Sequence, residues 1–271
     1  MSAPQHAVTA PTAHDRVFFS LLGALVLLAW LALAIWSTSP YARYLSHDWT
    51  QLGLAASLCA ALPAGELLLP AALFVGGWVL MTAAMMLPTT LPFVAAFRRL
   101  TARHDDRGAL LGALIGGYVL AWLAFGVGAH LVGLGLAEGV RRSDWLTFNG
   151  WAIAVVVLLA AGLFQFSSLK YRCLEECRSP LGFIAARWSG RRPWRESVRL
   201  GWAHGLFCVG CCWALMALMF VVGAGSIFWM LALGAVMALE KNRPWGRRMA
   251  APLGLGLVAA AGVVAAGGLA G

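Results

Sequence analysis

The chain of 271 residues is 61% hydrophobic and only 11% charged, with a mean hydropathy of +0.79. Soluble domains carry about 25% charged residues, so this composition excludes an ordinary soluble fold and indicates a polytopic membrane protein. The net charge of +9 does not indicate a nucleic-acid partner, because the basic residues lie in short segments between apolar runs, where they set membrane topology.

Apolar runs of about 17–25 residues, the length that crosses a bilayer, recur along the whole chain. We predict an all-α transmembrane helix bundle of seven spans, with six as the alternative because the sixth run is short. The runs cover residues 17–37, 71–97, 108–138, 148–168, 200–222, 226–241 and 249–270.

These runs also divide the chain into regions. We expect a tail, a first span, an external loop, a membrane core that includes a long inner loop, and a last span. In chain order the regions are residues 1–16, 17–37, 38–70, 71–245 with its inner loop at 169–199, and 249–270.

The basic residues are distributed very unevenly between the two sides of the predicted bundle. Of the 20 Lys and Arg residues, 17 fall on the side of the N-terminus, and the other three are Arg43, Arg141 and Arg142. Because short cytoplasmic segments carry the excess of Lys and Arg, the N-terminus is predicted to be cytoplasmic. With seven spans the C-terminus is then external.

The second run combines methionines with a helix breaker. Met81 and Met85 are four residues apart on one helix face, Trp78 and Met86 flank them, and Pro88 follows. Since proline lacks the backbone N–H, we expect a kink just past the methionines. Interrupted helices in membranes often mark binding sites, although Met packed around a proline kink is the plain alternative.

Two cysteines lie at the start of the inner loop, in the pattern Cys173-x3-Cys177. The cytoplasmic location argues against a structural disulfide. The neighbouring Lys170, Arg172 and Arg178 favour the thiolate, which is the form that binds metal.

The fifth run carries the densest group of soft ligands in the chain. Their spacing of i, i+4, i+7 and i+8 places an imidazole and three thiols on one helix face. Thiolate, thioether and imidazole together suit Cu(I), or else Zn(II), whereas a lone membrane cysteine is usually packing. The residues are His204, Cys208, Cys211 and Cys212, followed by Met216 and Met219.

The sixth run adds Met230 and Met237, seven residues apart on one face, and ends in Glu240 and Lys241. A carboxylate at the inner boundary is expected to pair with Lys241 or Arg243. An acid inside the membrane would instead indicate a functional group.

Together these segments predict a site for a soft metal ion distributed over several helices. No residue pattern typical of hydrolases or nucleotide-binding enzymes occurs, which favours a role other than catalysis. The candidate metal ligands are His204, Cys208, Cys211, Cys212, Met81, Met85, Met86, Met216, Met219, Met230, Met237, Cys173 and Cys177, and the further candidates are Trp78, Pro88, Glu240 and Lys241.

Three motifs resemble a bacterial family of predicted metal-binding integral membrane proteins, some of which are labelled copper chaperones. The resemblance covers roughly residues 70–245. It implies a multi-pass protein of the bacterial inner membrane that handles copper, with a copper-donor or copper-acceptor protein as partner. The motifs are Trp78-x2-Met81-x2-Ala84-Met85-Met86-x-Pro88, Leu169-Lys170-x2-Cys173-x3-Cys177-Arg178-x-Pro180, and the run from Cys208 through Cys211-Cys212-Trp213-x2-Met216 and Met219 to Glu240-Lys241.

Three functions remain open from the sequence. The first is Cu(I) handling as a chaperone, insertion factor or transporter. The second is a thiol-disulfide oxidoreductase, in which Cys208-x2-Cys211 would exchange with Cys173 and Cys177. The third is a non-catalytic membrane scaffold, in which cysteine and methionine only fill space.

Overall fold

The computed structural model describes residues 13–38, 68–219 and 226–270, and every regular element within these ranges is a helix. The all-α prediction is therefore confirmed for the described part of the chain. The external loop predicted at 38–70 lies almost wholly outside it. The elements are α1 (Ala13–Ser37), α3 (Leu68–Met81), η4 (Thr82–Met86), η5 (Pro88–Thr90), α4 (Leu91–Leu100), α5 (Arg107–Arg141), α6 (Asp144–Phe148), α7 (Trp151–Phe164), α8 (Ser168–Arg178), α9 (Pro180–Ala185), α10 (Pro193–Ala217), α12 (Ile227–Asn242), η6 (Gly246–Met249) and α13 (Ala250–Ala270).

Four continuous helices are long and apolar enough to cross a membrane, and two bent helix pairs raise the number to six if each pair is one span. The sixth predicted run corresponds to α12, which has 16 residues and is about 24 Å long. This is shorter than the roughly 30 Å of a bilayer core, so a seventh span stays a prediction. The four continuous helices cover Arg16–Ser37, Arg107–Arg141, Pro193–Ala217 and Gly246–Leu269.

The second run is bent where the sequence predicts it. The helices Phe74–Met86 and Pro88–Leu100 meet at 44°. Ahead of the bend, η4 is a π-helix, and the N–H of Leu87 reaches back to the carbonyl of Thr82 at 3.1 Å. Pro88 then opens the short 3-10 helix η5, because it has no N–H to continue the ladder.

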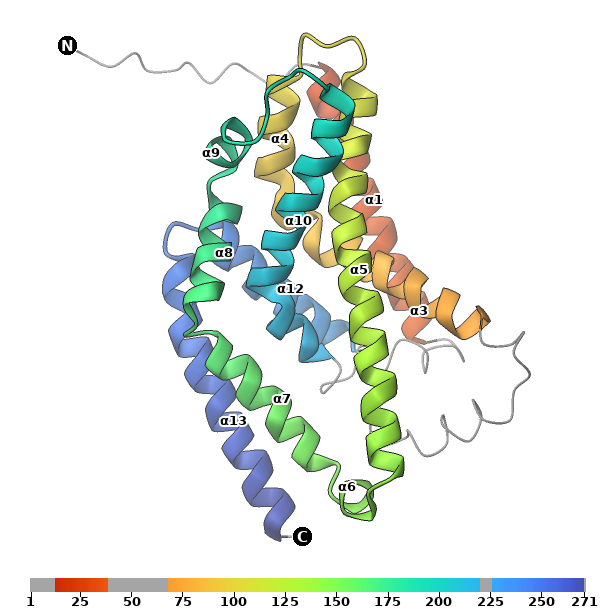
Figure 1. Cartoon of the computed structure of the whole chain (residues 1–271), viewed down its shortest axis with the longest axis vertical. Coiled ribbons are helices and arrows are strands. Elements are labelled where there is room, and N and C mark those ends of the chain that lie inside the picture. Colours follow the sequence, from red (N-terminus) through yellow and green to blue (C-terminus); the bar gives the residue numbers. More distant parts are fainter. Residues whose placement is uncertain (1–12, 39–67, 220–225, 271) are drawn as a thin grey trace, which may run out of the picture.

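The fourth run is also bent, at 62° between α7 and α8. The Ser167 side chain caps α8 by accepting a hydrogen bond from the N–H of Lys170 at 3.1 Å. The predicted inner loop is therefore partly helical, and Cys173 and Cys177 lie one turn apart on α8. Figure 1 shows α7 rising from α6 beside α13, and α8 continuing upward toward α9.

The closest helix packing joins α5 and α10, which lie side by side along the upper half of the bundle in Figure 1. A Cβ added to Gly201 would overlap the carbonyl oxygen of Leu114, and one added to Gly117 would overlap that of Val198. Gly205, one turn after Gly201, faces Ala121 in the same way. Such small residues allow two backbones to touch, as is typical of membrane helix pairs.

We predict that Gly201→Ala destabilises the protein by about 1–3 kcal/mol, because the added methyl has no space between the two backbones. Thermal unfolding of the purified protein in detergent measures the loss. Gly112→Ala is the matched control, since a Cβ at Gly112 on α5 meets no atom within 4 Å. Equal unfolding temperatures for the two variants would contradict the close packing.

Candidate metal centre

The predicted sulfur ligands meet in one buried core. Seven of the nine methionines of the chain belong to it, together with four cysteines, and Cys177 packs against it. The sulfurs come from helices far apart in sequence, so the contact between helices that the sequence left open is present in the structure. The members are Met81, Met85, Met86, Met216, Met219, Met230, Met237, Cys173, Cys208, Cys211 and Cys212.

Four thiols form the centre of this core. Cys211 Sγ lies 3.3 Å from Cys212 Sγ on α10 and 4.0 Å from Cys177 Sγ on α8. Cys208 is close enough to interact with both Cys177 and Cys212. We call Cys177, Cys208, Cys211 and Cys212 the thiol cluster. All five described cysteines are free, so the thiols are available as ligands.

Cys208 has the most polar surroundings of the four. Its sulfur lies 2.9 Å from Lys241 Nζ and 3.0 Å from the Tyr118 hydroxyl. An ammonium can only donate hydrogen bonds, so the Cys208 sulfur is the acceptor. Lys241 Nζ also donates to Thr89 Oγ1 at 3.2 Å and approaches Met86 Sδ at 3.9 Å. One buried cation thus joins α10, α12 and the kinked segment of the second run.

Cys173 and Cys177 contact different parts of α10. A Cβ added to Gly210 would lie 2.6 Å from the Cys173 sulfur, so Cys173 packs on the backbone of α10. Cys177, one turn later, reaches Cys211 instead. Of the predicted pair, only Cys177 joins the thiol cluster.

His204 is buried among aromatic rings. Its imidazole stacks on Phe93 with the centroids 3.9 Å apart and the planes at 8°, and Phe183 meets it edge-on at 5.3 Å. Only 2% of His204 is exposed, so the imidazole lies inside the bundle. Its Nδ1 has no hydrogen-bond partner among the described residues.

The remaining candidates of the second run act mainly through packing. Trp78 donates from Nε1 to the carbonyl of Trp122 at 2.8 Å and fills the space above Gly126, which fixes α3 on α5. Met85 lies beside Gly234 of α12. These contacts hold the kinked segment, with Pro88, against the thiol cluster.

Glu240 pairs with a residue that the sequence does not suggest. Lys170 Nζ donates to both carboxylate oxygens at 2.8 and 2.9 Å and also to the Gln165 side-chain oxygen. The expected pairing with Lys241 or Arg243 is wrong, and so is the expected surface position, because the side chains of Lys170 and Glu240 are 0% and 1% exposed. Arg178 adds a hydrogen bond to the Glu240 carbonyl at 2.5 Å.

Cys211 Sγ lies within 4.0 Å of two other thiol sulfurs, those of Cys212 and Cys177. In the part of the chain that the structure describes, no three His, Cys, Asp or Glu side chains form a ready metal site.

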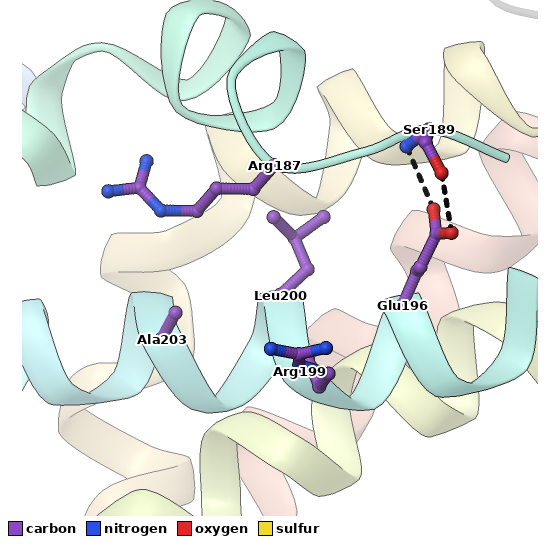
Figure 2. Close-up of a pocket in the computed structure, with 6 residues that line it drawn as sticks. All are labelled: Arg187, Ser189, Glu196, Arg199, Leu200 and Ala203. Carbon is purple, nitrogen blue, oxygen red and sulfur yellow. Dashed lines mark hydrogen bonds between the residues drawn. The ribbon is translucent and has the colours of Figure 1, made fainter. Parts of the chain in front are cut away.

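An open cavity of about 500 Å³ lies further along α10, toward its N-terminal end (Figure 2). At this cavity the Glu196 carboxylate accepts hydrogen bonds from the hydroxyl and the backbone N–H of Ser189. Arg187, Arg199 and Leu200 also line it. Leu200 precedes Cys208 by about 12 Å along the helix. The residues that line this cavity carry no sulfur, so the cavity is separate from the thiol cluster.

Sequence reasoning did not find Tyr118, Thr89, Lys170 or Gln165 as members of the polar surroundings. Tyr118 lies in an apolar helix, 90 residues before its partner Cys208, and has no neighbouring motif. Gln165 is a polar residue near the end of an apolar run. A polar residue in such a position is the available signal, because it needs a buried partner.

The model of the PpoB2 family, described as copper chaperone, matches residues 75–264. This is more than half of the chain, so the chain belongs to this copper chaperone family. The match contains the thiol cluster and extends into α13, beyond the motifs, which end at Lys241. Neither the curated proteins nor the solved structures give a match.

We predict that Lys170→Met alone, or Glu240→Leu alone, destabilises the protein by about 3–5 kcal/mol, because each leaves an unpaired buried charge. The double variant should recover much of the loss, which a double-mutant cycle on unfolding in detergent measures. Arg247→Gln is the control: its exposed pair with Glu175 on the same α8 should contribute less than about 1 kcal/mol. Additive losses in the double variant would contradict a direct ion pair.

Proposed function

We propose that this protein binds Cu(I) as cargo within its membrane bundle and passes it on, as a chaperone, insertion factor or transporter. The observation that carries the proposal is the convergence of four thiols and seven thioethers from four parts of the chain in one buried core. Thiolate and thioether sulfur selects Cu(I) over hard cations. Membership of the copper chaperone family supports the same ion.

The arrangement suits an ion that must leave again. The thiols pair at 3.3 and 4.0 Å and form no ready closed site in the described ranges. A cation held by two or three sulfurs can be passed between them by exchanging one ligand at a time. Cys177 on α8 and the cysteines of α10 then form the centre of the path, with thioethers around it.

We assign the centre to a multi-pass protein of the bacterial inner membrane, with the N-terminus cytoplasmic and seven spans. The support is the placement of 17 of 20 basic residues on one side and the four to six apolar helices. Cys177 and the basic α8–α10 segment then face the cytoplasm. A copper-donor or copper-acceptor protein is the partner that such cargo requires.

The central test is titration of Cu(I) against a competing chelator, on purified protein in detergent. The variant with Cys208, Cys211 and Cys212 all replaced by Ser should bind at least about tenfold more weakly than wild type, equivalent to about 1.4 kcal/mol. Met249→Leu is the control, because Met249 is outside the sulfur core and should leave binding unchanged. Equal affinity of wild type and the triple variant would refute the site.

The two cysteines of α8 provide a sharper comparison. Cys177→Ser should weaken Cu(I) binding by about tenfold or more, the scale on which metal-site contacts act, because Cys177 reaches the Cys211 sulfur. Cys173→Ser, one turn away, should bind like wild type, because Cys173 packs on Gly210. The same chelator competition measures both affinities. Equal losses of Cu(I) affinity would contradict the assignment of Cys177, and not Cys173, to the thiol cluster.

The topology has its own test. With seven spans, a reporter fused after residue 271 should lie outside, where alkaline phosphatase is active and a fluorescent cytoplasmic reporter is not. With six spans the two reporters exchange their activities. Fusions in the basic segment between α9 and α10 are the control, since both counts place that segment in the cytoplasm.

A further inference from the structure

The ammonium of Lys241 lies among the atoms that a soft cation would contact. Its hydrogen-bond partners in the described ranges are Cys208 Sγ at 2.9 Å, Thr89 Oγ1 at 3.2 Å and Met86 Sδ at 3.9 Å. The side chain is 6% exposed and Cys208 is fully buried. The Lys241 ammonium therefore lies at the edge of the thiol cluster.

No carboxylate among the residues that the structure describes is hydrogen-bonded to Lys241, whose partners are Cys208, Thr89 and Met86. Glu240, the adjacent residue, accepts hydrogen bonds from Lys170 with both carboxylate oxygens, and that pair is neutral as a whole. Arg178 donates to backbone carbonyls of Glu240 and Pro244, not to the cluster. Any metal ion bound at Cys208 thus lies beside the ammonium of Lys241.

We propose that Lys241 is a charge selector, which makes the thiol cluster favour a monovalent soft cation over a divalent one. The inference rests on the proposed function and names its specificity determinant. Repulsion by the ammonium scales with the charge of the bound ion, so a divalent ion is penalised twice as strongly at the same place. The apolar surroundings make this difference large, because they screen it poorly.

The same selection holds if the ion displaces the ammonium. When Cu(I) takes the place of the Lys241 ammonium, one positive charge replaces another, and the buried charge stays constant. When Zn(II) takes that place, the buried region gains one extra positive charge, which an apolar core disfavours. Both routes therefore disfavour the divalent ion.

Cu(I) and Zn(II) provide a clean comparison, since both have filled d shells and both bind thiolate. The affinities of wild type, Lys241→Leu and Lys241→Arg for each ion are measured by chelator competition. Leucine removes the charge and adds no ligand atom beside Cys208. Because both ions bind the same thiolates, the ratio of the two dissociation constants isolates the difference between the ions.

We expect Lys241→Leu to lower the preference for Cu(I) over Zn(II) by at least about tenfold, and Lys241→Arg to retain the wild-type preference. If Lys241→Leu does not fold, Lys241→Gln carries the same test, because it removes the charge and keeps an N–H donor. A preference within about threefold of wild type in the neutral variant overturns the selector.

The outcomes separate the two proposals. A wild-type protein that binds Cu(I) through the three α10 cysteines but shows the same ion preference without Lys241 loses only the selector. A wild-type protein that binds neither ion overturns the copper function and the selector together. Loss of preference in Lys241→Leu and its retention in Lys241→Arg support both.

Discussion

The backbone contact between α5 and α10 is the constraint on which the thiol cluster depends. Gly117, Gly201 and Gly205 let the two helices touch, and a Cβ at each would overlap the neighbouring helix. Tyr118 follows Gly117 directly, and Cys208 comes one turn after Gly205. The hydroxyl of Tyr118 therefore reaches the Cys208 sulfur at 3.0 Å. With larger residues at the contact, the helices would lie further apart and the Tyr118 hydroxyl would no longer contact the Cys208 sulfur.

A second constraint acts at the end of α12, where two adjacent charges point to different neighbours. Glu240 pairs with Lys170 of α8, and Lys241 extends to Cys208 and Thr89. Each would be costly in an apolar core without a partner. Because both are buried, the end of α12 is fixed against α8 on one side and against α10 and the kinked segment on the other. Met237 and Met230, on the same helix, belong to the buried core that holds the thiols, although α12 is short.

The sequence predicts features that act within one helix and fails for those that join helices. The bend follows from Pro88 alone, because a missing N–H is a local defect. The shared face of Cys208, Cys211 and Cys212 follows from helical spacing. The pairing of Glu240 with Lys241 was wrong for a reason visible in the sequence, since neighbouring helical residues do not face each other. Lys170 is 70 positions away and could not be found without the packing.

His204 shows where helical spacing misleads even within one helix. It shares a face with Cys208, but its ring is held between Phe93 and Phe183, which belong to α4 and α9. Spacing gives the direction of a side chain, whereas its partner depends on which helix lies opposite at that height. The side chains around His204 are aromatic rings, among them that of Tyr118. One turn later along α10, Cys208 contacts the Tyr118 hydroxyl and the Lys241 ammonium. The thiol cluster therefore begins at Cys208, and the aromatic packing around His204 closes its N-terminal end on α10.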